Sequence, residues 1–326
     1  MNEKSLKSIR WGIIGLGKIA HKFATDLVNV PNTSLYAVAS RSQESANAFA
    51  HEFNATRAYG SYENLVNDPE VDAIYIATPH RFHKAHTLLC LQHQKAVLCE
   101  KPFAMNLQEV SEMIAVAKAQ KVLLMEALWT YFLPHYTFVL EIVKEERFGK
   151  LIGLEADFGF YAPFNSESRV FKKELGGGSL LDIGIYPIFA AISTLGLPEN
   201  IEAIATFYEN GVDASCDMVF QYSNAQAVLK STFLKETATE AIFTFENAQL
   251  QIDSRFHESK RVCIVQNGKE EVHTFERSSM GYNYEIEHFN WLLRAGKTES
   301  NLMSFEFSKN LIKTLDLVRE KIGLSY

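Results

Sequence analysis

The first 125 residues alternate short apolar runs with longer amphipathic stretches. The runs are rich in β-branched residues, as in buried parallel strands, and the stretches repeat apolar residues at three- and four-residue intervals, as helices do. The predicted strands are Ile9–Gly15, Ser34–Ser40, Ala73–Ala77, Ala96–Cys99 and Val122–Met125, and the predicted helices are Ile19–Val28, Glu44–Phe53, Arg81–Gln92 and Leu107–Ala119. This pattern predicts a doubly wound parallel sheet that binds ligands beyond the carboxyl ends of its strands.

After about Ala127 the pattern changes to long alternating runs separated by turns that contain Asn and Gly. The predicted strands are Ile201–Phe207, Met218–Tyr222, Ala227–Phe233, Ala241–Phe245 and Val262–Val265, and the predicted helices are Ser179–Ser193, Tyr284–Arg294 and Phe305–Ile322. We therefore expect an α/β Rossmann domain over residues 1–125. An α+β domain with a large, mostly antiparallel sheet should follow over residues 126–326.

Composition narrows the class of partner. A chain of 326 residues with 47% hydrophobic and 22% charged residues should fold throughout, as two domains. A formal charge of −7 argues against general binding to nucleic acid or a membrane surface, so a small molecule is the expected partner. Because the start of the chain has no long apolar run, neither a secretory signal nor a membrane anchor is expected, and the predicted location is cytoplasmic.

The cysteines and one histidine series raise the question of a metal. The four cysteines form no Cys-x-x-Cys pair and are expected to be free, buried thiols. His80, His83 and His86 are three residues apart, but no cysteine or carboxylate lies at ligand spacing beside them. We therefore predict no metal site.

A dinucleotide fingerprint follows the first predicted strand. Gly15 permits a tight turn, Gly17 lets the backbone approach a pyrophosphate, and Ala20 lets the next helix pack closely on the strand. The pyrophosphate would meet the unpaired N–H groups at the helix start. The alternative is a glycine-rich turn before an ordinary helix. The predicted fingerprint is Gly15, Leu16, Gly17, Lys18, Ile19 and Ala20.

The end of the second predicted strand indicates which dinucleotide binds. An NAD-binding protein usually places an acidic residue there to hold the ribose hydroxyls, but this chain has Ser40 and Arg41. A guanidinium makes paired, charge-assisted hydrogen bonds to a phosphate and stacks on adenine. NADP is therefore favoured over NAD, although the pair can also tolerate NAD, and Arg41 could instead be a solvated loop residue.

Six blocks in order carry a family resemblance. Besides the fingerprint they are residues 58–62 (AYGSY), 71–80 (VDAIYIATPH), 100–102 (EKP), 125–129 (MEALW) and 176–186 (GGGSLLDIGIY). The chain resembles the glucose-fructose oxidoreductase, inositol dehydrogenase and rhizopine-catabolism (Gfo/Idh/MocA) family, and is most similar to its dimeric dihydrodiol dehydrogenase and NADP-dependent xylose dehydrogenase branch. The resemblance implies a Rossmann domain followed by an open-faced sheet that often mediates dimerisation, so a homodimer or higher homo-oligomer is expected.

Three residues are the candidates for catalysis. Lys101 follows a buried strand and so should lie at the ligand-binding edge, and Pro102 after it can carry a cis bond. Asp182 and Tyr186, four residues apart in a helix, should share one face, and the glycines before them let backbone or ligand approach. Tyr186 would give a proton to the substrate oxygen or take it back, and Lys101 would stabilise the tyrosinate. Asp182 would orient a substrate hydroxyl. The alternatives are a surface lysine, a salt-bridge aspartate and a buried tyrosine.

Other candidates for the site rest mainly on the resemblance. It implies that Thr78, Pro79, His80, His83, Glu100 and Lys101 contact the cofactor, although the histidines could equally be structural. Trp129 and Phe160, with Phe158 and Tyr161 near the latter, are candidates for an apolar wall against the substrate, although Trp129 could be simply core. Tyr131 stands where the dihydrodiol branch is expected to have a basic residue, and this puts that branch's substrate range in doubt.

These observations predict an NADP(H)-dependent oxidoreductase acting on a CH–OH group of a sugar, sugar derivative or vicinal diol. Two alternatives from the same resemblance stay open. One is a glycosidase that retains NAD, and the other is a non-catalytic regulator that binds a dinucleotide, although a regulator would not need Lys101 and Tyr186. The sequence names neither the substrate nor the physiological direction.

Overall fold

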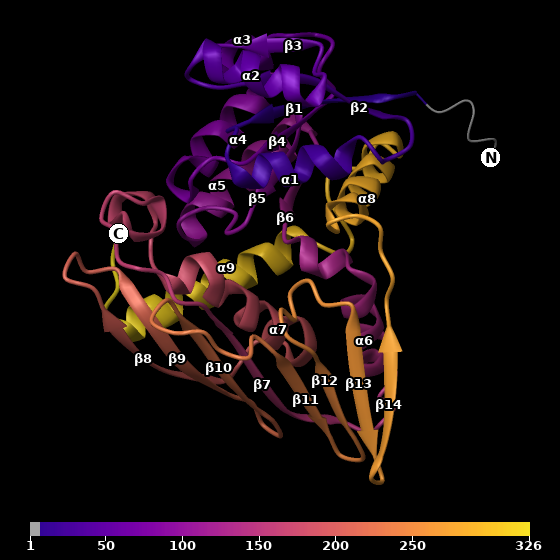
Figure 1. Ribbon diagram of the computed structural model, residues 1–326, viewed down its shortest axis with the longest axis vertical. Helices are drawn as coiled ribbons and strands as arrows, with labels where there is room; N and C mark the ends of the chain where they lie inside the picture. The colour runs from indigo at the N-terminus through magenta and orange to yellow at the C-terminus, as the bar shows by residue number, and fades with distance from the viewer. Residues whose placement is uncertain (1–6) are drawn as a thin grey trace. The chain divides into compact units, whose positions relative to one another are not determined.

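Two units make up residues 7–326, the part of the chain that the computed structural model describes (Figure 1). The first unit runs to Trp129 and includes Ser278–Ser308. The second comprises Thr130–Arg277 and Lys309–Tyr326. The sequence analysis assigned all of residues 126–326 to the second domain. The structure differs, because residues 278–308 return to the first unit.

Helix α8 (Tyr282–Arg294) explains this return. The Asp26 carboxylate accepts the backbone N–H groups of Met280, Gly281 and Tyr282 at 2.8–3.0 Å, where the helix begins. On the same helix, Asn290 Oδ1 accepts the indole N–H of Trp11 at 3.1 Å. Such pairing over more than 250 positions leaves no local pattern in the sequence.

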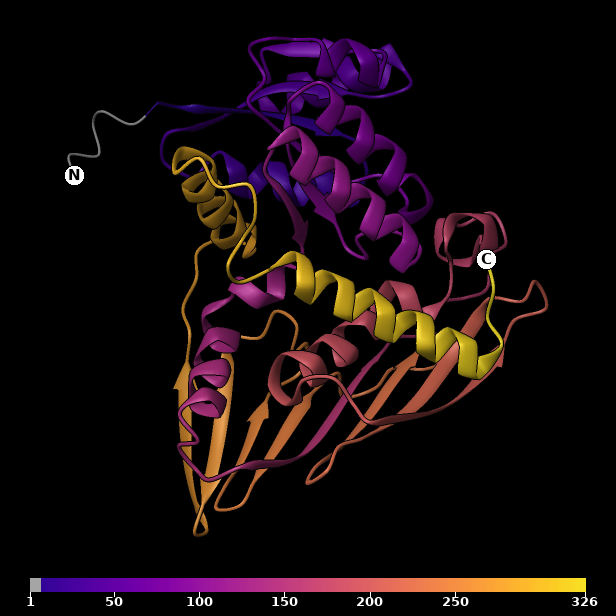
Figure 2. The same cartoon turned by 180° about the vertical axis from the view of Figure 1, so that it is seen from behind.

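The first unit has a six-stranded parallel sheet in the order β3-β2-β1-β4-β5-β6. Helices α1 and α8 pack on one face, and α4 and α5 on the other (Figures 1 and 2). The strands are β1 (Ile9–Ile14), β2 (Thr33–Ala39), β3 (Arg57–Tyr59), β4 (Ala73–Ile76), β5 (Ala96–Glu100) and β6 (Leu124–Ala127). The helices that connect them are α1 (Lys18–Leu27), α2 (Gln43–Phe53), α3 (Tyr62–Val66), α4 (His83–Gln92) and α5 (Leu107–Gln120). The sequence missed the short elements β3 and α3.

The second unit has an eight-stranded sheet in the order β14-β13-β12-β11-β7-β10-β9-β8. Neighbouring strands are antiparallel except β7 and β10, which are parallel. The strands are β7 (Leu151–Gly159), β8 (Asn200–Phe207), β9 (Asp213–Gln221), β10 (Gln226–Thr232), β11 (Ala241–Phe245), β12 (Gln249–Ile252), β13 (Arg261–Gln266) and β14 (Lys269–Thr274). The sequence indicated a strand around Phe158, where β7 lies, but missed β12 and β14. The predicted fold class of both halves is confirmed.

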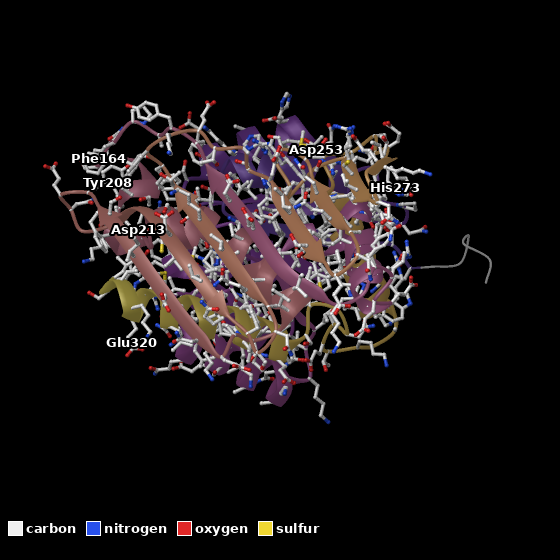
Figure 3. The ribbon with its side chains drawn as sticks, turned by 90° about the horizontal axis from the view of Figure 1, so that it is seen from below. Phe164, Tyr208, Asp213, Asp253, His273 and Glu320 are labelled. Atoms are coloured by element: carbon white, nitrogen blue, oxygen red, sulfur yellow. The ribbon has the colours of Figure 1, made fainter. Side chains whose placement is uncertain are left out.

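Helices cover one face of this sheet and leave the other open. The helices are α6 (Pro134–Lys144), which the sequence missed, α7 (Ile185–Leu195) and α9 (Phe305–Ile322). Helix α7 packs on β7 and β10. Figure 3 looks onto the open face, where Ile204 is 73% exposed.

One segment is apolar enough to cross a membrane by length and composition. It covers Lys173–Leu195, and 89% of its apolar window is buried in the fold, so it is a core helix here. The free thiols of Cys90, Cys99 and Cys216 are buried as predicted, whereas that of Cys263 is partly exposed.

Candidate active site

The candidate residues of the first unit gather at one edge of its sheet. Because all six strands are parallel, their carboxyl ends meet at the same edge. Gly15 follows β1, Ser40 follows β2, Thr78 comes just after β4, and Lys101 follows β5 directly. The pattern of the sequence therefore placed these residues together.

The turn between β1 and α1 is shaped to admit a ligand. Gly15 has φ of +88°, and a Cβ atom there would lie 2.8 Å from the Ala77 carbonyl, so the fold itself requires this glycine. A Cβ atom on Gly17 would meet no atom of the described residues within 4 Å. Ile19 is 38% exposed, and Ala20 is fully buried. Helix α1 has no acidic residue in its first turn and no side-chain cap, so its N–H groups suit a pyrophosphate.

Arg41 is exposed and lies beside an aromatic pair that the sequence did not reveal. Burial raises the pKa of Tyr62, and the Arg41 charge opposes this shift. Burial lowers the pKa of His86, and Arg41 and Glu63 act on it as well, in opposite directions. The rings of Tyr62 and His86 meet edge to face at 4.7 Å, and His86 Nδ1 lies 3.0 Å from Thr78 Oγ1. Arg41 thus provides a cation, and Tyr62 and His86 provide aromatic rings beside it.

His83 connects the loops that follow β4 and β5. Its side chain is fully buried, with Nε2 2.7 Å from the Thr78 carbonyl oxygen and Nδ1 2.8 Å from the Pro102 carbonyl oxygen. The Lys101–Pro102 peptide bond is cis, as the sequence suggested. His83 therefore fixes the segment that carries Lys101. His80 is buried as well, with its ring 5.8 Å from that of His83.

Buried carboxyl groups surround the segment of Lys101. Glu100 accepts hydrogen bonds from the Tyr75 hydroxyl and, at 3.1 Å, from the Lys101 N–H. Glu126 accepts the Phe103 N–H at 3.0 Å, and burial raises the pKa of its carboxyl to about 7. Glu285 is fully buried, and neither of its oxygens has a partner among residues 7–326.

Burial raises the pKa of Glu285 well above its usual value, and the charges of Glu100 and Asp26 add to this effect. Burial is thus the main cause of the raised pKa of both Glu126 and Glu285, and Glu100 adds to it in each case. Sequence reasoning missed both, although Glu126 lies inside one of the resemblance blocks.

In the second unit, Asp182 and Tyr186 lie where one kind of helix changes into another. A π-helical turn over Leu180–Gly184 leads directly into α7. Pro187 has no N–H to bond the carbonyl of Ile183, and a wider turn relieves the clash between its ring and that carbonyl. Turns of this type are frequent at functional sites.

Each of the two side chains has an identifiable neighbour. The Asp182 carboxylate pairs with the Arg169 guanidinium at 3.2 Å. Tyr186 is 6% exposed, and its ring lies 5.6 Å from that of Phe158 and 5.0 Å from that of His257. The sequence did not single out Arg169 or His257, because no local pattern distinguishes either residue.

Two of the three glycines before this helix lie where the fold leaves no room for a Cβ atom. A Cβ atom on Gly177 would lie 2.8 Å from the Val170 carbonyl oxygen. Gly178 has φ of +119°, and a Cβ atom there would collide with Asp213 Oδ1. Asp213 in turn accepts the Ser179 hydroxyl and the Leu180 N–H, both at 2.7 Å. Gly177 thus permits a close approach of backbone, as one of the two predicted reasons had it, whereas Gly178 makes room for the Asp213 carboxylate.

The aromatic candidates fall into different environments. Trp129 is 5% exposed and stacks on Tyr282 at 4.6 Å, inside the first unit. Phe160, just after β7, is 37% exposed and contacts Phe158 and Phe233. Tyr131 packs on Phe189 in the second unit, and burial raises its pKa. Residues 7–326 contain no group of three or more His, Cys, Asp or Glu side chains arranged to hold a metal.

Family models and known proteins match nearly the whole chain. Residues 9–128 match the model of the oxidoreductase family with an NAD-binding Rossmann fold (GFO_IDH_MocA), and residues 136–252 match the GFO/IDH/MocA C-terminal domain. The trans-1,2-dihydrobenzene-1,2-diol dehydrogenase of Xenopus tropicalis is 36% identical over 97% of this chain and 99% of its own length. The scyllo-inositol 2-dehydrogenase (NADP(+)) IolU of Bacillus subtilis (strain 168) is 34% identical over 98% of both.

Solved structures share this fold over nearly the full length. A 3-ketoreductase from Actinomadura kijaniata in complex with NADP and TDP-benzene has a TM-score of 0.86 at 25% identity, covering 97% of this chain and 98% of its own. An aldose-aldose oxidoreductase from Caulobacter crescentus complexed with glycerol has a TM-score of 0.89 at 19% identity, covering 97% of both chains, and supports the fold alone. The chain therefore belongs to the GFO/IDH/MocA family of oxidoreductases and is an NAD(P)-dependent dehydrogenase, as the resemblance in its sequence implied.

Proposed function

We propose that the protein transfers a hydride between NADP(H) and a CH–OH or carbonyl group of a sugar, sugar derivative or vicinal diol. The observation that carries this proposal is the pair formed by Tyr186 and Asp182, a phenol and a carboxylate one helical turn apart at a π-to-α junction. A phenol can exchange a proton with a substrate oxygen, and a carboxylate can accept a hydrogen bond from a neighbouring hydroxyl. Relatives named for a diol and for an inositol support the same class of substrate.

The cofactor would lie at the edge of the parallel sheet. The open space at Gly17 and the uncapped start of α1 suit its pyrophosphate, and Ser40 and Arg41 suit a 2′-phosphate. The proposed binding set is completed by Leu16, Lys18, Ile19, Ala20, Thr78, Pro79, His80, His83, Glu100 and Lys101. The bound nicotinamide supplies or accepts the hydride. NADP is also named for one relative and for a structure with the same fold.

The chain's own residues manage the proton. In reduction, the Tyr186 O–H bond breaks and its proton passes to the substrate oxygen as the carbonyl carbon gains the hydride. The Lys101 ammonium stabilises the resulting tyrosinate, and Asp182 accepts a hydrogen bond from an adjacent substrate hydroxyl. In oxidation the tyrosinate takes the proton back. A structure with NADP and substrate bound that held the Lys101 and Tyr186 side chains away from the same substrate would overturn this mechanism.

Aromatic side chains provide the proposed substrate wall. Phe158 lies beside Tyr186 in the second unit, and Phe160 contacts Phe158, so both rings can face the apolar C–H groups of a substrate ring. Trp129 would add little contact area to this wall, because it is almost fully buried against Tyr282.

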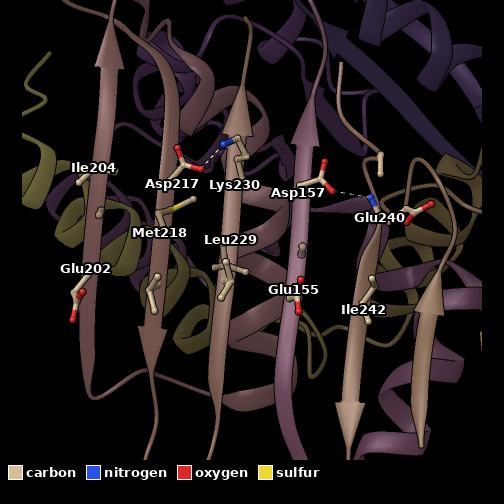
Figure 4. A pocket seen from close by; sticks show the side chains of 15 residues that line it. Glu155, Asp157, Glu202, Ile204, Asp217, Met218, Leu229, Lys230, Glu240 and Ile242 are labelled. Carbon is tan, nitrogen blue, oxygen red and sulfur yellow. Dashed lines mark hydrogen bonds and ion pairs between the residues drawn. The ribbon is translucent and has the colours of Figure 1, made fainter. Parts of the chain in front are cut away.

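The open face of the large sheet is proposed as the surface that joins two copies of the chain. A shallow hollow crosses β8, β9, β10, β7 and β11 on this face (Figure 4). It combines exposed apolar residues, Ile204 and Val228, with the paired charges of Lys230 and Asp217. None of the catalytic candidates lines it, so its chemistry fits a protein surface better than a substrate.

Replacement of Tyr186 by Phe tests the proposed function. The wild type should consume NADPH with an aldose or ketose, or reduce NADP⁺ with a polyol or diol. The variant should bind NADPH normally but turn over at least ~100-fold more slowly, because it lacks the acid–base group. Absorbance at 340 nm reports turnover, and quenching of protein fluorescence reports binding. Hydrolysis of a glycoside without net cofactor consumption would point instead to a glycosidase, and cofactor binding without turnover of any such substrate would point to a regulator.

A further inference from the structure

Asp182 has a cationic partner that the mechanism above does not use. Arg169 lies in the loop after β7, and its guanidinium meets Asp182 Oδ1 at 3.2 Å. The Arg169 side chain is 44% exposed and that of Asp182 is 16% exposed. An ion pair this accessible to water contributes little to the stability of a fold. We therefore ask what the pair of Arg169 and Asp182 does in the proposed substrate site.

The fold holds the Arg169 turn against the segment that carries Asp182. The N–H groups of Gly177 and Gly178 donate to the carbonyls of Lys172 and Val170, each at 2.9 Å. A Cβ atom on Gly177 would collide with this turn. Phe171, next to Val170, is buried and its carbonyl accepts the Asn210 side-chain N–H at 2.6 Å. The glycine run thus brings the arginine to the aspartate.

The two charged groups have opposite hydrogen-bonding abilities. A guanidinium only donates, and it presents five N–H bonds in one plane, of which the contact with Asp182 uses one. A carboxylate only accepts. A substrate hydroxyl does both, so two neighbouring hydroxyls can be held side by side by such a pair. A hydrocarbon ring with two oxygens has the reacting oxygen and one other, whereas a polyol offers further oxygens.

We propose that Arg169 is a positioning and specificity-determining residue, which orients the Asp182 carboxylate and binds an additional oxygen of a polyol substrate. The inference rests on the proposed function and narrows its substrate class to sugars and cyclic polyols with at least three adjacent oxygens. It also supplies a basic residue in a chain that has Tyr131 where one was expected.

The test compares variants of Arg169 on two kinds of substrate. Steady-state kinetics with NADP⁺ are measured for polyols (D-xylose and scyllo-inositol) and for trans-1,2-cyclohexanediol. Arg169→Met should lower kcat/KM for the polyols by at least ~10-fold, mainly through KM, and lower it clearly less for the diol, which lacks the additional oxygen. Arg169→Lys should restore part of the loss. The acidic limb of the pH profile should move to higher pH in Arg169→Met, because Asp182 loses its cation.

Arg147→Met is the matched control, because Arg147 is 41% exposed and pairs with Glu145 at 2.7 Å in a different part of the second unit. It should keep wild-type kinetics on both kinds of substrate. The proposal is overturned if Arg169→Met has the same kinetics as this control. It is also overturned if Arg169→Met lowers kcat/KM equally for both kinds of substrate and leaves the pH profile unshifted. These results are distinct from a failure of the proposed function, in which Tyr186→Phe would retain the wild-type rate.

Discussion

Two acidic residues near the start of α8 show how strongly local donors determine the state of a carboxyl group. Asp26 accepts three backbone N–H groups at the beginning of the helix. Glu285, on the first turn of the same helix, is fully buried and has no donor among residues 7–326. A buried carboxylate without donors is costly, which is why burial raises the pKa of Glu285 well above its usual value.

The raised pKa of Glu126 makes the stability of the protein depend on pH. In the unfolded chain the glutamate ionises near its usual value of 4.5, whereas in the folded protein its pKa is about 7. Its contribution is therefore fully present below pH 4.5 and is lost as pH rises to about 7, by at most about 3 kcal/mol. When the pH is raised from about 5 to about 8, the wild type should lose thermal stability and Glu126→Gln should not, because glutamine does not ionise. The Tm of the variant relative to that of the wild type should therefore be higher at about pH 8 than at about pH 5.

Differential scanning calorimetry at the two pH values checks this expectation. Glu112→Gln is the control, because Glu112 is an exposed glutamate that pairs with Lys84. Parallel changes of wild type and Glu126→Gln with pH would contradict the expected proton on Glu126.

Arg41 is the residue that decides the proposed preference for NADP. Replacement by Ala should raise KM for NADPH by at least ~10-fold and leave KM for NADH nearly unchanged, because only NADPH has the phosphate that a guanidinium binds. NADH serves as the internal control. An equal loss for both cofactors would refute the assignment of the 2′-phosphate to Arg41.

At the scale of elements, the segment from Gly176 to Leu195 shows why a helix can be predicted more easily than its irregularity. Its apolar spacing predicted a helix over Ser179–Ser193, and the structure has a π-helical turn followed by α7. Pro187 is the local cause of the wide turn, but a proline in a helix can also simply kink it. Asp213, on β9, accepts the Leu180 N–H and so fixes where the helix begins. That choice depends on a strand distant in sequence.

At the scale of the whole molecule, the open sheet face determines the proposed assembly. A face that exposes Ile204 and Val228 beside paired charges should be covered by a second copy of the chain. We expect the wild type to be a dimer and Ile204→Glu to be a monomer, because a buried, unpaired carboxylate opposes association.

Light scattering coupled to size-exclusion chromatography measures both masses. Leu197→Glu is the control, since Leu197 is 46% exposed but lies outside the sheet, and it should remain dimeric. A wild-type mass equal to that of one chain would exclude this role for the sheet.

The sequence by itself determined what depends on neighbouring residues. Periodicity predicted the parallel sheet and most helices, and the glycine spacing marked the turn after β1, because these signals lie within a few positions of each other. Parallel strands end at one edge, so the order of elements alone brought Gly15, Arg41, Thr78 and Lys101 to that edge.

The tertiary structure decided what depends on contacts between distant segments. It returned residues 278–308 to the first unit, buried Glu285 with no donor among residues 7–326, and placed Arg169 against Asp182. It also set His257 beside Tyr186 and Tyr62 beside His86. The physical reason is that burial and charge pairing are properties of a position in space, and residues far apart in the chain carry no shared period that would reveal them.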